Sequence, residues 1–373
     1  MKKLSQIWER VMGITMNINP AFNIINLIVL SSLRGKRLKK TKWNKINIYF
    51  WSALFISGVI STIGAYDVSK AIPNFLIPFV FIWFYIMGKY FIDKPITFLK
   101  DMVRGTTILA LITILSRVFS WRLVYKGTEI INGHARANIF GIGDNGLGVI
   151  IQAGIIGALG LFIIEKKYKA KAFHLIYILL NITALIISSS RGAMVGTAAG
   201  SIVLSVFMSW KIILLLVSIV TIALYTNNRF YRRVLSIFSL EDRSNYQRIK
   251  VYEGTLHMIK EHLFFGVGPG NFHNIYPRYK VPEETIEAMT PHSNYLNIIS
   301  GWGILGGLFF FGWIFYTIIY NTLRTSNKYK KIIIAVLIGF WVHVIVNDLA
   351  TVYSAVLMGL LDNQNLEEVP ETD

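Results

Sequence analysis

The sequence predicts an all-α polytopic membrane protein with about ten to twelve transmembrane helices and one large external loop. Of the 373 residues, 54% are hydrophobic and only 16% are charged, whereas soluble domains carry roughly 25% charged residues. The mean hydropathy is +0.51. The chain also divides into apolar runs close to the length of about 20 residues that crosses a bilayer as a helix. We therefore expect a single integral membrane domain over 1–373, multi-pass in a cell membrane.

The apolar runs place the predicted helices along the chain. The first run contains four asparagines and a proline, so the sequence leaves open whether it spans the membrane, and the last run is short. The predicted helices cover 12–33, 46–64, 71–92, 104–121, 144–164, 172–189, 192–209, 211–226, 295–320, 332–347 and 349–361.

Basic loops give the predicted orientation. Lys and Arg collect in cytoplasmic loops, and stepping through the helices puts every strongly basic short loop on one side: 34–45, 93–103, 165–171 and 321–331. The acidic tail 362–373 falls on this cytoplasmic side as well. These loops account for much of the net charge of +18, so we exclude nucleic acid as a partner. The lipid bilayer is the expected surrounding of the protein. No cysteine is present, so thiol chemistry and disulfides are excluded.

The same alternation of sides from helix to helix predicts three external segments: 122–143, the tight connection at Ser188–Gly192 and the long segment 227–294. Within the long segment, helical spacing of apolar residues predicts an amphipathic helix at the membrane surface over 244–263. Its apolar stripe consists of Ile249, Tyr252, Leu256, Ile259 and Leu263. The glycine cluster 266–270 must then turn the chain.

Two arginines are candidates for binding an anion. Arg191 lies between two apolar runs with almost no loop, where an ionisable residue indicates function; the alternative is an interfacial arginine that reaches the lipid headgroups. Arg248 lies at the start of the amphipathic helix, and its guanidinium matches phosphate geometry. Its alternative is a solvated surface arginine, since other arginines lie nearby: Arg229, Arg232, Arg233 and Arg243.

His292 is the candidate for proton transfer. It stands where the long segment re-enters the membrane, and a histidine exchanges a proton near neutral pH; the alternative is an ordinary interfacial histidine. Three more histidines occur in the same segment, at positions 257, 262 and 273. Their spacing does not match a metal motif such as H-E-x-x-H, so we expect no metal.

Arg136 precedes a glycine-rich stretch, 141–148. We expect no strand before these glycines. The required spacing is also missing and they run into a membrane span, so they are not a nucleotide fingerprint and favour close helix packing instead. For Arg136 itself the sequence leaves two alternatives open: contact with a ligand, or plain exposure in a loop. Together with Arg191, Arg248 and His292 it predicts a cationic cleft on the outer face, suited to an anionic lipid-linked substrate such as a polyprenyl diphosphate.

These pieces, in this order, resemble the O-antigen ligase and O-antigen polymerase family of bacterial membrane glycosyltransferases over about 130–310. The matching pieces are Ser-Ser-Arg191-Gly-Ala, Arg248, Gly266-Val-Gly-Pro-Gly-Asn-Phe272, Pro291-His-Ser-Asn-Tyr-Leu296 and Gly303-Ile-Leu-Gly-Gly. There are departures: Ser293 separates His292 from Asn294, Gly301 replaces an acidic residue common in the family, and a proline usual before the glycine turn is Leu263 or Phe264 here.

The resemblance implies a fold of the GT-C class and a metal-independent glycosyltransferase without a cofactor. It assigns the donor diphosphate to Arg191 and Arg248 and the acceptor hydroxyl to His292. It also implies substrate contacts for Arg136, Asn294 and Tyr295.

The predicted function is polymerisation of undecaprenyl-diphosphate-linked oligosaccharide repeat units into a capsular, exopolysaccharide or O-antigen chain, at the outer face of the bacterial cytoplasmic membrane. A flippase and a chain-length regulator of the same pathway are the expected partners. The alternatives are O-antigen ligase-type transfer to another acceptor, a polysaccharide transporter or flippase, and a non-enzymatic scaffold.

Overall fold

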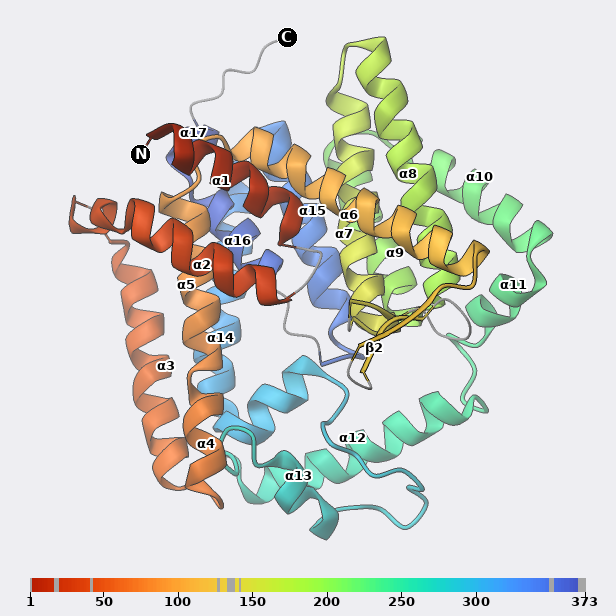
Figure 1. The fold of residues 1–373 in the computed structure, drawn as a ribbon. Helices are drawn as coiled ribbons and strands as arrows, with labels where there is room; N and C mark the ends of the chain where they lie inside the picture. Colours follow the sequence, from red (N-terminus) through yellow and green to blue (C-terminus); the bar gives the residue numbers. More distant parts are fainter. Residues whose placement is uncertain are drawn as a thin grey trace.

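The computed structural model describes residues 2–16, 20–40, 43–125, 128–132, 138–140, 142–348 and 352–367. Helices dominate them (Figure 1). Five helical stretches are long and apolar enough to cross a membrane: Lys45–Ile63, Val68–Tyr90, Asp144–Ile164, Tyr168–Ser188 and Asn294–Arg324. The predicted class, an all-α polytopic membrane protein, is confirmed. The count of ten to twelve spans stays a prediction, because four further predicted helices are described with 17 residues or fewer: α9 (Arg191–Phe207), α10 (Lys211–Thr226), α15 (Lys328–His343) and α16 (Val352–Leu361).

The elements follow one another as helices with a single small sheet. In chain order they are α1 (Lys2–Thr15), α2 (Pro20–Arg34), η1 (Gly35–Lys40), α3 (Lys45–Ile63), α4 (Val68–Phe75), α5 (Ile77–Tyr90), α6 (Pro95–Val118), β1 (Arg122–Tyr125), β2 (Thr128–Asn132), β3 (Asn138–Ile139), α7 (Asp144–Ile164), α8 (Tyr168–Ser188), α9 (Arg191–Phe207), α10 (Lys211–Thr226), α11 (Asn228–Leu235), α12 (Arg243–Glu261), α13 (Phe272–Ile275), η2 (Tyr276–Arg278), α14 (Asn294–Arg324), α15 (Lys328–His343), α16 (Val352–Leu361) and α17 (Gln364–Glu367).

The predicted run 12–33 is two helices rather than one. α1 and α2 have 14 and 15 residues, each shorter than the about 20 residues of a span. Pro20 is the first residue of α2, a position that proline favours because its missing N–H is not needed there. α1 packs along α6, and Arg10 forms an ion pair with the fully buried Asp101 of α6.

α6 begins nine residues before the predicted start of 104. This first part was not predicted as part of the helix because it contains three charged residues, Lys100, Asp101 and Arg104. Arg104 also pairs with Asp101, so this buried carboxylate has two cationic partners. The β1–β2–β3 sheet was not predicted either, and the expectation that no strand precedes the glycines 141–148 is wrong, because β3 ends at Ile139. Its strands are antiparallel neighbours, with Leu123 opposite Ile131 and Ile131 opposite Ile139.

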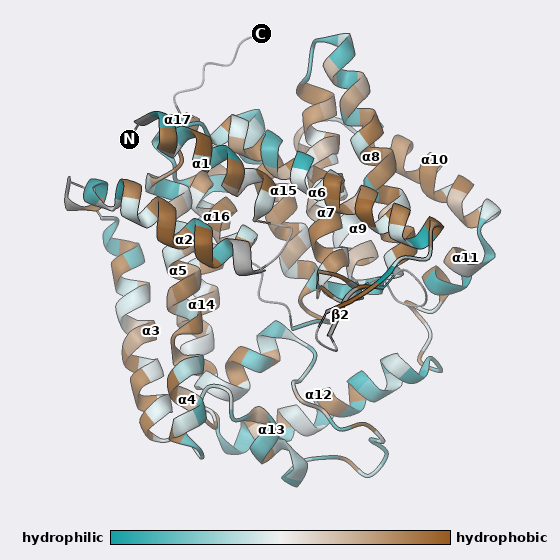
Figure 2. Ribbon diagram, in the orientation of Figure 1, coloured by the Kyte–Doolittle hydropathy of each residue, from teal (hydrophilic) through white to brown (hydrophobic). Residues whose placement is uncertain are grey.

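The main hydrophobic core surrounds α7. Most of its apolar stretch is buried, and it contacts α6, α8, α9 and α15. α5 and α16 pack backbone to backbone, because a Cβ on Gly359 would stand 2.1 Å from the carbonyl oxygen of Tyr85. Hydropathy follows this arrangement: brown apolar helices fill the upper part of the view, and teal residues gather on α11–α13 and at helix ends (Figure 2).

The segment 227–294 has a hydrophobic core of its own. Its buried members come mainly from α12, α13 and the 267–288 loops, and are Val251, Met258, Val267, Phe272, Ile275, Tyr276 and Ala288. The predicted helix is present as α12. Its apolar stripe is divided, because Ile259 is buried while Ile249 and Leu256 stay exposed.

The glycine cluster joins this segment to α14. Gly266 has φ +68° and Gly303 has φ +72°, which interrupts the helical geometry of α14. Three backbone hydrogen bonds cross the junction, among them Ile304 N to Leu263 O at 2.8 Å. A Cβ on Gly303 would stand 2.1 Å from the carbonyl oxygen of Phe264. The chain therefore turns here as predicted, and α12 is held close to the start of α14.

Candidate functional site

Arg191 is presented by a sharp reversal between two helices. Ser189 ends α8 in the left-handed conformation, φ +54°. The next residue, Ser190, caps α9 by accepting a hydrogen bond from the backbone N–H of Ala193. Arg191 is therefore the first residue of α9, and only 7% of it is exposed.

The Arg191 guanidinium is bound to the start of α12. It forms an ion pair with Asp242 at 2.8 Å and donates to the backbone carbonyl of Ser236 at 3.2 Å. Asp242 also caps α12 by accepting from the backbone N–H groups of Ser244 and Asn245. Although burial opposes ionisation, the hydrogen bond from Arg191 holds the pKa of Asp242 below its usual range. This carboxylate thus fixes α9 and α12 to each other.

Arg248 is a half-buried cation with vacant hydrogen-bonding capacity. Among the residues that the structure describes, its guanidinium has no hydrogen bond and no ion pair within 4.0 Å. Burial lowers its pKa; the nearby Tyr252 opposes this, and the positive charge of Arg191 adds to it. A desolvated guanidinium beside a second guanidinium favours an anion that bridges both.

His292 has a constrained backbone. Its φ of +53° lies in the left-handed region, which is uncommon for any residue but glycine. The Tyr252 hydroxyl donates to its carbonyl oxygen at 3.3 Å. The backbone N–H of Asn294 donates to Val344 and Asn347 at the end of α15. The turn is therefore held from both α12 and α15.

The His292 imidazole is set for proton acceptance. Burial lowers its pKa, and the negative charge of Asp348 partly opposes this effect. The ring is consequently neutral at neutral pH, the state in which a histidine accepts a proton.

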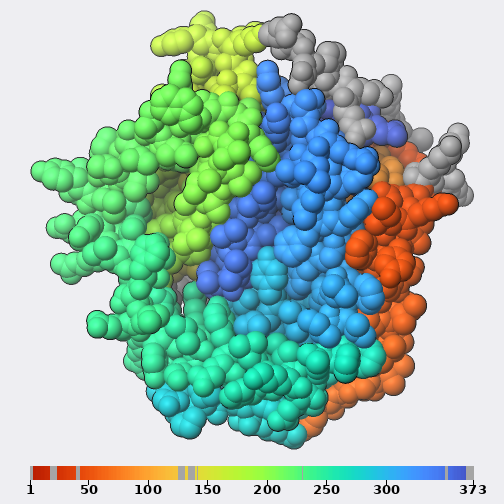
Figure 3. Space-filling model, turned by 180° about the vertical axis from the view of Figure 1, so that it is seen from behind, coloured from red at the N-terminus to blue at the C-terminus, as the bar shows by residue number. Residues whose placement is uncertain are grey.

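The structure brings the three sequence candidates together. Arg191 and Arg248 act electrostatically on each other, Arg248 acts on His292, and Asp348 acts on both Arg248 and His292. They come from α9, α12 and the turn before α14. Seen from behind, the surface is hollowed where the green α9–α11 region, the teal α12 region and the blue C-terminal helices meet (Figure 3).

Residues 176–311 match the family model described as O-antigen ligase. This stretch is similar to the O-antigen ligase family. It contains Arg191, Arg248 and His292, and it supports the resemblance seen in the sequence. Among curated proteins, none matches the chain.

The O-antigen ligase stretch also contains two of the predicted substrate contacts. Asn294 begins α14 and belongs to the turn described above. Tyr295 stacks on Phe311 with ring centroids 4.7 Å apart, and its hydroxyl donates to the carbonyl of Trp341. Tyr295 is thus engaged between α14 and α15. Arg136 lies outside the described residues. Substrate roles for all three remain predictions.

Sequence reasoning missed Asp242, Asp348 and the positioning contact of Tyr252. Asp348 could have been noticed as an acidic residue directly after the apolar run of α15. Tyr252 was assigned only to the apolar stripe, yet it follows Arg248 by four residues and so shares its helix face.

A buried polar cluster of α7 and α15 lies next to Gly192. His343 is fully buried, and its Nδ1 lies 3.0 Å from Gln152 Oε1. A Cβ on Gly192 would stand 2.7 Å from His343 Nε2 and 2.5 Å from Asn347 Nδ2. Only glycine therefore fits after Arg191, which explains the Arg-Gly pair in the motif.

Within the described ranges, no group of three or more His, Asp or Glu side chains is arranged to hold a metal ion. Two of the three other histidines in 227–294 have partners of their own: His262 Nε2 lies 3.3 Å from the Tyr279 hydroxyl, and His273 lies 3.7 Å from Glu287. Metal independence stays a prediction.

Proposed function

We propose that this protein polymerises undecaprenyl-diphosphate-linked oligosaccharide repeat units into a capsular, exopolysaccharide or O-antigen chain. The observation that carries the proposal is the half-buried Arg248, which has no ion pair or hydrogen bond among the described residues and lies beside Arg191, with His292 in the same electrostatic cluster. A diphosphate supplies the two negative charges that this pair of cations favours.

Both arginines stabilise the leaving group of the reaction. When the glycosidic C–O bond to the diphosphate breaks, negative charge grows on the departing undecaprenyl diphosphate. Fixed guanidinium groups stabilise that charge without reorganising. Arg248 donates its N–H groups to one phosphate, whereas Arg191 is oriented by Asp242 and donates its remaining N–H groups to the ligand.

His292 serves the other substrate. The acceptor hydroxyl attacks the anomeric carbon, its oxygen forms the new C–O bond, and its proton passes to the neutral imidazole. A single displacement of this kind inverts the anomeric centre. The electrons of the broken bond stay on the diphosphate, so the step balances without a metal, a nucleotide sugar or another cofactor.

The proposal includes a location and partners. Segment 227–294 and the site face outward from the bacterial cytoplasmic membrane, because the basic loops 34–45, 93–103, 165–171 and 321–331 are retained inside. Repeat units must then be delivered across the membrane by a flippase, and a chain-length regulator is the other expected partner.

Ligase-type transfer is the second candidate, since the matched family model is described as O-antigen ligase. The same site would then pass a finished glycan to a different acceptor. A polymerase mutant retains single repeat units on the carrier, whereas a ligase mutant retains long chains on it, so gel display of the lipid-linked glycan separates the two functions.

The test is gel display of polysaccharide length in a polymerase-deleted strain that carries each variant at matched membrane abundance. Arg191→Lys and Arg248→Lys keep the charge but lose the bidentate fork. We expect each to cost about 2–4 kcal/mol in the transition state, or roughly 30- to 1000-fold in rate. His292→Ala should stop chain growth while donor binding is kept.

Arg243→Ala and Arg278→Ala are the matched controls, because both side chains are exposed and lie in the same segment. Full-length polymer from both His292→Ala and Arg191→Lys would show that these residues are structural and would overturn the proposed site.

A further inference from the structure

A second polar pocket lies far from Arg191 and His292. It has a volume of about 700 Å³ and is bounded by the start of α3, the end of α5, the last turns of α14 and the 362–365 segment. Its lining on α14, Tyr316–Tyr320, begins 13 residues after the interruption of that helix at Gly303, about 20 Å along the helix. The predicted topology has the basic segment 321–331 inside and the segment 227–294 outside, so we expect the two sites at opposite membrane faces.

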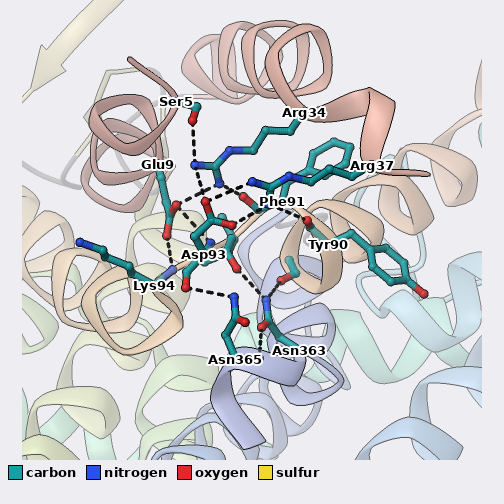
Figure 4. A network of polar contacts seen from close by, with 12 residues as sticks. Ser5, Glu9, Arg34, Arg37, Tyr90, Phe91, Asp93, Lys94, Asn363 and Asn365 are labelled. Atoms are coloured by element: carbon teal, nitrogen blue, oxygen red, sulfur yellow. Dashed lines mark hydrogen bonds and ion pairs between the residues drawn. The ribbon is translucent and has the colours of Figure 1, made fainter. Parts of the chain in front are cut away.

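One wall of the pocket is a rigid polar network. Arg37 forms a two-pronged ion pair with Asp93, and Asn365 donates to the Asp93 carbonyl (Figure 4). Asn363 donates to the carbonyls of Gly88 and Ile92. In these contacts the polar groups of the wall bond to one another, and this fixes the shape of the wall.

Lys89 is the cation of the pocket with spare hydrogen-bonding capacity. Over the described part of the chain its only polar partner is Asp362, with 3.5 Å between Nζ and Oδ2. Asp362 already accepts from the Tyr85 hydroxyl and, at 2.9 Å, from Asn321. The Lys89 ammonium also stands over the rings of Tyr85 and Tyr90, at 5.8 and 5.4 Å. It retains N–H groups for an acceptor inside the pocket.

The borders of the pocket are strongly basic. Segment 34–45 contains seven Lys or Arg and segment 321–331 contains four, and neither contains Asp or Glu. The Arg324 guanidinium lies 4.2 Å from the centroid of the Tyr320 ring at the pocket edge. Although the charges lining the pocket are balanced, the surrounding potential attracts anions.

The same edge has the composition of a membrane interface. Tyr90, Tyr316 and Tyr320 line the pocket, and Trp43 packs on Tyr90 with ring centroids 5.6 Å apart. Tyr and Trp collect where the hydrocarbon meets the headgroups. Beside them, Ile319 and Leu323 of α14 are exposed apolar residues, as expected of a surface that faces acyl chains.

We propose that this pocket binds the phosphate headgroup of an anionic phospholipid of the cytoplasmic leaflet. Lys89 binds the phosphate, and the tyrosines hold the glycerol region at the interface. Basic pockets between transmembrane helices on this side are a known way of recognising anionic headgroups. The ligand is a membrane lipid rather than a soluble phosphate because the pocket opens beside an exposed apolar helix face.

The experiment is native mass spectrometry of the purified full chain with added phosphatidylglycerol or phosphatidylcholine. The wild type should retain phosphatidylglycerol preferentially, and Lys89→Gln should weaken that binding about tenfold, as expected for one charge-assisted hydrogen bond. Lys328→Gln is the matched control: it removes the same charge from an exposed residue of the same basic border that does not line the pocket.

A second variant covers the case in which Lys89→Gln does not fold. Gln364→Glu adds a negative charge at an exposed position of the lining and should also reduce phosphatidylglycerol binding. Equal retention of both lipids by the wild type, equal losses in Lys89→Gln and Lys328→Gln, or an unchanged Gln364→Glu would each overturn the proposal. So would full displacement of the lipid by millimolar inorganic phosphate, which would indicate a soluble ligand. Glycan transfer need not change in any of these variants, so this test is independent of the proposed function.

Discussion

Arg191 and Arg248 have the same side chain but different surroundings, and the difference defines what each can do. The first is oriented by Asp242, whereas the second has no such partner within the described ranges. His292 is held through its backbone, whose carbonyl accepts a hydrogen bond from the Tyr252 hydroxyl. At the scale of single residues, the site is a set of oriented groups with binding capacity left over for a ligand.

Tyr252 is expected to position His292. Tyr252→Phe removes the hydrogen bond to the His292 carbonyl, which should lower the rate of chain growth about 3- to 10-fold while donor binding is unchanged. The measurement is polymerisation rate against donor concentration. Tyr246→Phe on the same helix is the control, because its side chain is exposed. Equal rates for wild type and Tyr252→Phe would mean that other contacts hold the turn.

The pH dependence follows from the environment of His292. A general base must be unprotonated, and burial lowers the pKa of His292 below its usual value of 6.5. Activity should therefore persist as pH falls through 6.5 and be lost only at lower pH. Asp348 raises this pKa, so Asp348→Asn should move the acidic limb of the pH–rate profile to still lower pH. A shift to higher pH would contradict the assigned electrostatics.

Among the elements, the junction between the 263–268 turn and α14 positions the site most directly. It depends on backbone contacts that a side chain would block, at Gly266 and at Gly303. The interruption of α14 at Gly303 lets Ile304 donate to Leu263. α12, with Arg248 and Tyr252, is thereby kept beside the turn that carries His292.

Gly303→Ala should destabilise the protein strongly. The added Cβ meets the backbone of Phe264, and φ of +72° is strained for alanine. The conformational strain alone costs about 1–3 kcal/mol. Gly301→Ala is the matched control, because its nearest neighbour would be an ordinary 3.4 Å contact. Thermal unfolding of the two purified variants gives the comparison, and equal stability would show that the junction is not tightly packed.

Sequence patterns located elements and single residues better than partnerships between them. α7 agrees with its predicted bounds because its apolar run is uninterrupted. α6 was placed too late because Asp101 looked unfavourable until Arg10 and Arg104 paired with it. For the site, short motifs identified the residues that the structure brings together. Asp348 could have been noticed from its position, but the contacts of Asp242 with Arg191 and the influence of Asp348 on Arg248 and His292 could not be predicted, because they arise only when separate helix ends meet.

For the whole molecule, topology is the prediction on which the outward-facing site depends. Reporters fused after residues 40, 168 and 328 should read as cytoplasmic, since basic loops are retained there. A reporter inserted near residue 280 should read as external. An external reading at 168 would overturn the helix order and place Arg191 and Arg248 on the wrong side for a flipped donor.

The central claim is transfer from a diphosphate carrier without a metal. The most direct measurement is product formation by the purified protein in vesicles that contain an undecaprenyl-diphosphate-linked repeat unit and EDTA. We expect the wild type to form oligomers of several repeats and release undecaprenyl diphosphate, whereas Arg248→Lys should be at least about 30-fold slower and His292→Ala should give no oligomer. Equal products from the wild type and both variants, or activity only when divalent metal is restored, would contradict the account.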